Sequence, residues 1–330
     1  MKTKSKTGEI VTGYLRRFPT TPTLSLARKI YKENKEYFTN IESVRSLLRH
    51  YRGAHGKKEK ECLINKEFLD QDYSLPKSHA EKRKVFNLPL SCNNVLLISD
   101  IHVPYQDNEA IKVAVEYGKK SKINCIFING DLIDFHMISR FVHLERKPDI
   151  AYELKATRKF LKYLNHEFPK VPIYFLFGNH DLRLQTFLAS KAPELLDMSE
   201  FKLEVLLDAK SCNMTVIDDT VLVKMGKLAV THGHLLSKGF IAPVNAARGL
   251  FLKAKASSIM SHVHKVSTHS ETNINGKTIT TYSTGCLCEL NPRYSPYANN
   301  FSHGFAHVKF QKGGNFSVKN IQVIDGIIVN

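Results

Sequence analysis

The sequence predicts an α/β protein, a sandwich of strands and helices preceded by a small helical domain. Three observations lead to this prediction. After Leu90, short β-rich runs alternate with longer amphipathic stretches. Five of these runs end in Asp, Asn or His residues. Before residue 57, apolar residues recur with helical spacing and the charge is strongly basic.

The composition is that of a globular protein with one large domain and a small one. The chain has 330 residues, of which 42% are hydrophobic and 24% are charged. No run reaches the roughly 18 apolar residues of a membrane span, and no apolar segment follows the basic start, so we expect a cytoplasmic protein with no membrane partner. Six cysteines without CxxC spacing predict neither a disulfide framework nor a cysteine zinc site.

A basic helical module is predicted over residues 1–56. Two segments have helical period, through Leu24, Ala27, Ile30 and Tyr31 and then through Ile41, Val44, Leu48 and Tyr51. Thr39 and Glu42 have the spacing of a capping box for the second helix, and Gly53 is placed to end it. Residues 57–92, which include KKEKE and EKRK, are interpreted as a linker.

Charge is concentrated in this region. The net charge is +17, and residues 1–90 hold 20 Lys/Arg against 10 Asp/Glu. On a helical wheel Arg45, Arg49 and Arg52 fall within an arc of about 60°. This ridge favours a helix-turn-helix-like module that binds nucleic acid, although a solvated face has the same pattern. The alternative role for the module is oligomerisation or partner docking, and the oligomeric state stays open.

The catalytic domain is predicted over residues 93–330. Strands are expected at Val95–Ser99, Ile123–Asn129, Ile173–Phe177, Lys227–Thr231, Ser257–Ser261, Thr278–Ser283 and Ala306–Phe310. Helices are expected near Asn108–Lys120, Ile150–Glu167, Arg183–Leu196 and Pro243–Lys255.

Potential metal ligands follow five of these strands. They lie in the sequences Asp100-Ile-His102, Gly130-Asp131, Gly178-Asn179-His180-Asp181, His232-Gly233 and His262-Val263-His264. Ligands at strand ends converge at one edge of a sheet. Oxygen donors mixed with imidazoles, without thiolate, suit Mn²⁺, Fe, Zn²⁺ or Ni²⁺.

These blocks resemble the signature of the calcineurin-like metallophosphoesterase superfamily, which runs D-x-H, G-D-x-x-D, G-N-H-[DE], H and G-H-x-H. All five occur here in order, and the resemblance covers roughly residues 93–325. It implies a four-layer αββα sandwich. The whole layout also resembles DNA-repair-exonuclease-like phosphoesterases of phages and prophages.

The resemblance implies two divalent metal ions, with Mn²⁺ expected to be the most effective. One would be held by Asp100, His102, Asp131 and His264, and the other by Asp131, Asn179, His232 and His262. A shared carboxylate damps the repulsion between two adjacent cations, which agrees with a bridging Asp131. By the same resemblance His180 is the general acid, Asp181 could orient it, and Asp134 has a framework role.

Two positions depart from the pattern. Phe135 stands where protein Ser/Thr phosphatases of the superfamily carry a phosphate-binding Arg, so the sequence argues against a Ser/Thr protein phosphatase. Ser261 replaces Gly in the last block. Further candidates for phosphate contact are His234, Arg140, Arg183, Arg248 and His136.

The function predicted is metal-dependent hydrolysis of phosphodiester bonds in nucleic acid. Hydrolysis of small nucleotides or other small phosphoesters is the alternative. A third hypothesis is a non-catalytic binding protein that keeps only the fold. The intact set of metal ligands and His180 argue against it.

Overall fold

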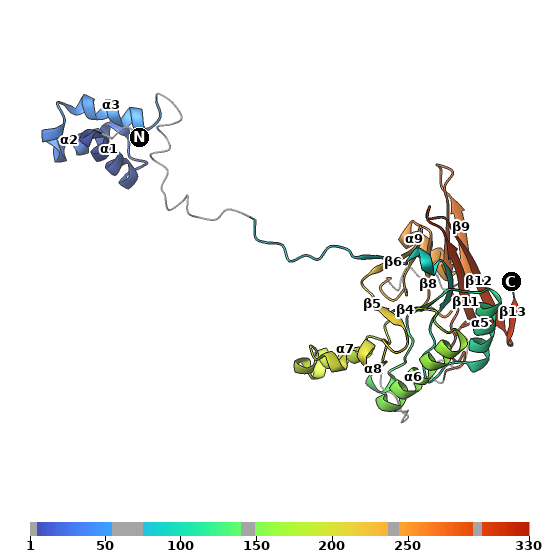
Figure 1. Cartoon of the computed structure of the whole chain (residues 1–330). Helices are drawn as coiled ribbons and strands as arrows, with labels where there is room; N and C mark the ends of the chain where they lie inside the picture. The colour runs from blue at the N-terminus through green and yellow to red at the C-terminus, as the bar shows by residue number, and fades with distance from the viewer. Residues whose placement is uncertain (1–4, 55–74, 140–148, 237–243, 293–298, 330) are drawn as a thin grey trace. The chain divides into compact units, whose positions relative to one another are not determined.

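The computed structural model describes residues 5–54, 75–139, 149–236, 244–292 and 299–329. It divides into two compact units, Met1–Ala80 and Glu81–Asn330, which we describe separately (Figure 1). No helix among the described residues is long and apolar enough to cross a bilayer.

The N-terminal unit contains three α-helices rather than the two expected. They are α1 (Lys6–Arg17), α2 (Thr23–Glu33) and α3 (Ile41–Tyr51), with the 3-10 helix η1 (Lys35–Tyr37) between the last two. Val11 and Leu15 of α1 are buried against the apolar faces of α2 and α3. The sequence pattern missed α1 because Gly8 and Gly13 lower its helix propensity and it has few apolar positions.

The ends of α3 are set by one unexpected residue and one expected residue. Asn40, not Thr39, is the N-cap, and its side-chain oxygen accepts a hydrogen bond of 2.8 Å from the Ser43 backbone N–H. Gly53 has a φ of 78°, a left-handed conformation suited to glycine just beyond a helix. The predicted stop is confirmed, and the predicted capping box is wrong.

Two sheets form the centre of the second unit. The six-stranded sheet has the order β1 (Val85–Asn87), β6 (Leu222–Met225), β7 (Leu228–Val230), β8 (Ser258–Met260), β10 (Thr278–Ser283), β9 (Ser267–Thr272). The seven-stranded sheet has the order β13 (Ile327–Val329), β12 (Phe316–Ile324), β11 (His303–Phe310), β2 (Asn94–Ile98), β3 (Cys125–Asn129), β4 (Ile173–Leu176), β5 (Met214–Ile217).

Helices cover the outer faces of both sheets (Figure 1). The longer helices are α5 (Asn108–Lys120), α6 (Ile150–Glu167), α7 (Arg183–Lys191) and α9 (Ala246–Ala254), beside the short helices α8 (Leu203–Leu206), η3 (Leu90–Cys92), η4 (His136–Ile138), η5 (Pro193–Leu195) and η6 (Ser199–Phe201). Helices α5 and α6 pack on the seven-stranded sheet, and α9 packs on the six-stranded sheet. The predicted four-layer αββα sandwich is confirmed.

Alternation along the central strands builds two cores at once. In β2, Leu96 and Ile98 belong to the core under the helices, whereas Val95 and Leu97 belong to the core between the sheets. Strand β3 repeats this pattern. Strands buried on both faces read as continuous apolar runs, which is why the sequence located them well.

The expected strands of this unit are all present, but peripheral strands were missed. Strand β12 alternates between buried or half-buried and exposed positions, β9 is mostly exposed, and neither has an apolar run. Strand β1 pairs in parallel with β6, so the end of the expected 57–92 linker belongs to the sandwich. Helix α7 ends at Lys191, short of the predicted Leu196, because Pro193 follows. Pro243, the predicted start of the last helix, lies outside the described residues.

The topology brings five strand ends to one edge. Strands β2, β3 and β4 are parallel neighbours in one sheet, and β7 and β8 are parallel neighbours in the other. Each of these strands is followed by one of the predicted ligand blocks. The carboxyl ends of parallel strands meet at the same edge, so the blocks converge there.

Candidate metal centre

The first two ligand loops run side by side. The backbone N–H of His102 donates to the Asp131 carbonyl at 3.0 Å, and that of Asp100 donates to the Gly130 carbonyl at 3.1 Å. Five predicted ligands have left-handed backbone, with φ between 50° and 71°, namely Asp100, His102, Asp131, His262 and His264. This conformation is disfavoured for residues with a Cβ, and it persists where the surrounding structure enforces it, as at functional sites.

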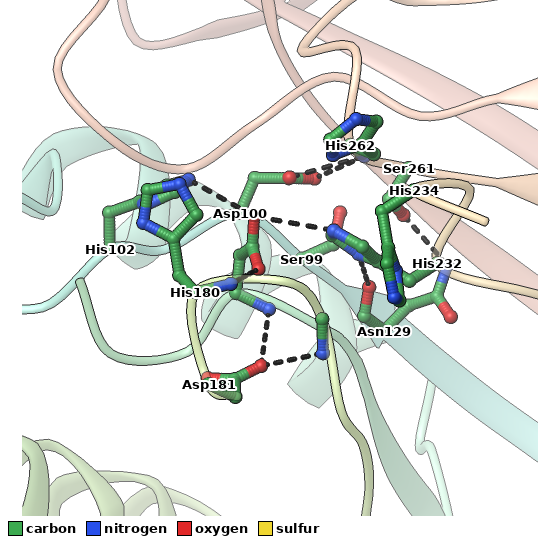
Figure 2. A network of polar contacts seen from close by, with 12 residues as sticks. Ser99, Asp100, His102, Asn129, His180, Asp181, His232, His234, Ser261 and His262 are labelled. Carbon is green, nitrogen blue, oxygen red and sulfur yellow. Dashed lines mark hydrogen bonds and ion pairs between the residues drawn. The ribbon is translucent and has the colours of Figure 1, made fainter. Parts of the chain in front are cut away.

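Asp131 lies at the middle of the centre. Its Oδ2 is 3.2 Å from Nε2 of His232 and 3.7 Å from Nε2 of His102, and its Oδ1 accepts a hydrogen bond of 2.9 Å from the backbone N–H of His180. Figure 2 shows His102, His180, His232 and His262, which come from different loops, gathered in one place. The carboxylate therefore has histidines of both predicted metal sites within reach.

Asp100 joins the last loop to the first. Nε2 of His264 is 3.2 Å from its Oδ1, and the backbone N–H of His262 lies 3.1 Å from both carboxylate oxygens. The Nε2 atoms of His102 and His264 are 3.3 Å apart. Nitrogens of two imidazoles that face each other beside a carboxylate form a ready set of ligands.

The orphaned polar atoms of the centre fit bound metal. Oδ1 of Asn179 is buried and makes no hydrogen bond among the described residues, and Nε2 of His232, also buried, lies 3.2 Å from Asp131 Oδ2 without the geometry of a hydrogen bond. Such atoms are rare in folded proteins unless they have a partner. Donor atoms of Asp131, His232 and His262 lie within 4.8 Å of one another, as do those of Asp131, His102 and His180. The residues present can thus hold two metal ions, as the sequence predicted.

Electrostatics support a charged carboxylate at Asp131 and a neutral imidazole at His262. Burial acts to raise the pKa of Asp131, but the neighbouring histidines, His232 first, outweigh it and hold the pKa well below its usual range. Burial, reinforced by His232, lowers the pKa of His262 to about 4. His262 is therefore neutral near pH 7, the form that binds a cation.

Two glycines make room for these side chains. A Cβ at Gly130, whose φ is 87°, would lie 2.2 Å from Nδ1 of His232, and a Cβ at Gly178 would lie 2.2 Å from Oδ1 of Asp131. Nδ1 of His232 instead donates to the Asn129 carbonyl at 2.7 Å, which directs Nε2 toward Asp131.

Asp181 does not orient His180, contrary to expectation. Its carboxylate accepts hydrogen bonds from the backbone N–H groups of Gly178, Asp131, Leu132 and Ile133, at 2.7 to 3.3 Å. These bonds join the loop after β3 to the loop after β4, as Figure 2 shows for Asp181. Burial, with the nearby Asp131 carboxylate, raises the pKa of Asp181 to about 7.

Asp134 makes the contact that Asp181 was expected to make. Its Oδ1 lies 2.9 Å from Nδ1 of both His102 and His180. Burial acts to raise the pKa of Asp134, but its hydrogen bonds to histidines outweigh burial and lower the pKa well below its usual range. A carboxylate on Nδ1 fixes the orientation of an imidazole and leaves Nε2 for metal or substrate.

Glu153 of α6 is a supporting residue that the sequence analysis missed. It is fully buried, and its carboxylate accepts from the backbone N–H groups of Phe135, at 2.5 Å, and His136, at 3.1 Å. Phe135 has a left-handed φ of 50° directly after Asp134. Burial raises the pKa of Glu153 to about 7. The available signal was an acidic residue on the apolar face of an amphipathic helix.

Cys288 is a second residue that the sequence did not single out. Its Sγ is 3.7 Å from Nδ1 of His264. Cysteine spacing could not reveal it, because its partner is a histidine 24 positions away.

Ser261, which replaces Gly in the last block, contacts Thr284 Oγ1 at 2.9 Å and accepts from Asn129 at 2.8 Å. The replacement is accommodated by hydrogen bonding.

The other residues predicted to contact phosphate lie at different distances from the metal centre or have other partners. His234 lies beside His232 and pairs through Nε2 with Asp219 at 3.0 Å. Arg183 reaches His180, His136 is buried next to Asp134, and Arg248 is exposed on α9. Arg140 lies outside the described residues.

A two-sheet sandwich with a carboxylate–imidazole centre at its strand ends defines a metal-dependent phosphoester hydrolase. The family model for calcineurin-like phosphoesterases matches residues 94–289, and the chain belongs to this family. The chain is 26% identical over 252 residues to the Gene 54 protein of Mycobacterium phage L5, covering 68% of this chain and 96% of that protein. With the Gene 54 protein of Mycobacterium phage D29 it shares 30% over 146 residues, 42% of this chain and 56% of that protein.

Solved structures to which this chain is similar include Vps29 from Cryptosporidium parvum, with 18% identity and a TM-score of 0.39 over 72% of this chain and 94% of that chain. The phosphoesterase YfcE from E. coli has 15% identity and a TM-score of 0.36 over 72% of this chain and 97% of that chain.

Replacing the central carboxylate should have a different effect from replacing the neighbouring histidine. We expect Asp131→Asn to abolish hydrolysis because a neutral amide in place of the shared carboxylate weakens both metal sites. We expect His180→Ala to keep its metal and to slow turnover roughly 10²- to 10⁴-fold. Metal analysis of the purified variants, with kcat for an aryl phosphodiester, distinguishes the two. Loss of metal from His180→Ala would contradict the separation of roles.

Asp134 and Asp181 should also differ on substitution. Asp134→Ala should slow turnover because His180 loses its orienting partner. Asp181→Ala should lower the free energy of unfolding by at least about 1–3 kcal/mol, since buried N–H groups lose their acceptor. Thermal unfolding and kcat, measured on both variants, test this. Equal stability of Asp181→Ala and the parent would refute the loop-joining role.

Proposed function

We propose that the protein is a nucleic-acid phosphodiesterase that uses two metal ions. The observation that carries this proposal is the presence, in one chain, of a phosphoesterase metal centre and a separate basic three-helix unit. A basic surface joined to a hydrolytic centre can retain a polyanionic substrate while its phosphodiester bonds are cut.

The residues around the centre have separable chemical roles. The metal ions, held by the seven predicted ligands, would activate water and neutralise charge on the phosphate. His180 lies beside this site, with Nδ1 held 2.9 Å from Asp134 Oδ1, so Nε2 is the ring atom left to protonate the leaving oxygen, once substrate replaces its 3.1 Å contact with Nη2 of Arg183. Asp134 also holds His102 at 2.9 Å, and thereby couples the acid to a metal ligand.

The three arginines of the predicted basic ridge are not equivalent. Arg49 is exposed, and Arg45 is paired with Glu42 at 3.0 Å on the surface, an arrangement that contributes little and is easily exchanged for phosphate. Arg52 instead donates to Thr23 Oγ1 at 2.6 Å and to the Thr21 carbonyl. We therefore assign phosphate contact to Arg45 and Arg49 and a structural role to Arg52.

Hydrolysis of small phosphoesters is the second candidate. The connection between α2 and α3 contains η1 and is longer than the three- or four-residue turn of a helix-turn-helix. In this alternative the N-terminal unit serves oligomerisation or partner docking.

Metal removal should abolish activity. We expect the chelated protein to be inactive and Mn²⁺, or Ni²⁺ or Fe²⁺, to restore hydrolysis better than Mg²⁺, because an imidazole-rich centre disfavours Mg²⁺. Assays on an aryl phosphodiester, a phosphomonoester and single- and double-stranded DNA, each with a series of metals, measure this. Full activity in chelator would exclude the metal-dependent mechanism.

The basic ridge should contribute to the salt dependence of the affinity for DNA. With Arg45 and Arg49 both replaced by Ala, affinity should fall and the log–log salt slope should flatten by up to about two units, at roughly 0.9 per duplex phosphate contact. Hydrolysis of the aryl phosphodiester should not change. Arg52→Ala is the comparison that tests stability of the helical unit. An unchanged slope would favour the small-phosphoester alternative.

A further inference from the structure

Arg183 places a guanidinium beside the candidate general acid. It is the first residue of α7, and its side chain is 18% exposed. Nη1 donates to the Asp134 carbonyl oxygen at 2.8 Å, and Nη2 lies 3.1 Å from Nε2 of His180. The same guanidinium is 3.8 Å from Oδ2 of Asp134. It therefore reaches the side of His180 that faces away from Asp134.

The position after G-D-x-x-D cannot supply such a group. Phe135 is fully buried within the core under the helices, and its backbone N–H is bound by Glu153. A side chain at this position is directed into the core, so an arginine here would bury its charge. Arg183 comes from another element and provides a cation next to the same aspartate.

We propose that Arg183 is the phosphate-binding arginine of this enzyme, contacting a non-bridging oxygen of the scissile phosphodiester. This inference rests on the proposed function. A guanidinium has five N–H groups, and the two hydrogen bonds described here use two of them. The remaining donors, on a permanently charged and partly exposed group, suit the paired oxygens of a phosphate.

The contacts of Arg183 also explain how it would be held ready. The Asp134 carbonyl fixes Nη1, and the backbone N–H of Arg183 donates to the His180 carbonyl at 3.0 Å. The arginine is thus tied at both ends to residues of the site. Because less side-chain freedom is lost on binding, a guanidinium positioned in this way binds phosphate more tightly than a free one.

The test compares Arg183→Ala and Arg183→Lys with the parent full-length protein loaded with Mn²⁺. We expect Arg183→Ala to raise the KM for bis(4-nitrophenyl) phosphate and the Kd for inorganic phosphate by roughly 10- to 100-fold, the usual effect of losing a charged hydrogen bond. Metal content and melting temperature should stay at the parent values. Arg183→Lys should partly restore the KM and the Kd, because lysine keeps the positive charge but lacks the paired N–H donors of the guanidinium.

Arg158→Ala, which removes an exposed arginine from α6, is the matched control and should leave both constants unchanged. Calorimetric titration with phosphate gives a readout that does not depend on turnover. If the parent hydrolyses the diester and Arg183→Ala keeps its KM and phosphate affinity, the inference fails and the proposed function stands. Loss of metal or of folding in Arg183→Ala and Arg183→Lys alike would assign Arg183 a structural role and overturn the inference. Should the parent hydrolyse no phosphoester, the proposed function fails, and phosphate affinity alone decides the role of Arg183.

Discussion

The structure of the catalytic unit depends on placing one buried carboxylate, Asp131, within reach of histidines from both sheets. Two of its neighbours, His102 and His232, come from strands in different sheets. A carboxylate buried this deeply is costly without compensating charge and hydrogen bonds. The imidazoles and the His180 backbone N–H supply both, and they also mark where metal ions would bind. Stability and chemistry therefore depend on the same contacts.

A second set of acids holds this arrangement without facing the metal site directly. Asp181 joins two ligand loops through backbone N–H groups, and Glu153 fixes the turn that follows Asp134. Asp134 then orients one metal ligand and the candidate acid at equal distances of 2.9 Å. Each of these carboxylates acts on backbone or imidazole groups, so conservative changes at these positions can affect catalysis through geometry alone.

The N-terminal unit has its own core and its own electrostatic character. Its helices bury Val11, Leu26, Val44 and Leu48. Arg52, directly after α3, stabilises the unit, whereas Arg45 and Arg49 of α3 remain on the surface. A helical wheel places these residues on one arc but cannot show that a neighbouring loop accepts the hydrogen bonds of one of them. The distinction required tertiary contacts.

The amino-acid pattern was enough to predict the sandwich, its central strands and the order of the metal-ligand blocks. Strands buried on both faces leave continuous apolar runs, and ligands that follow them must meet at one sheet edge. Which aspartate contacts which histidine became known only from the folded chain. Asp181 is adjacent to His180 in sequence, yet its carboxylate points to backbone N–H groups, whereas Asp134 arrives from 46 residues away. The contacts of Glu153, Cys288 and Arg183 also became known only from the structure. Contacts between side chains depend on how distant segments pack, and they leave no local pattern in the chain.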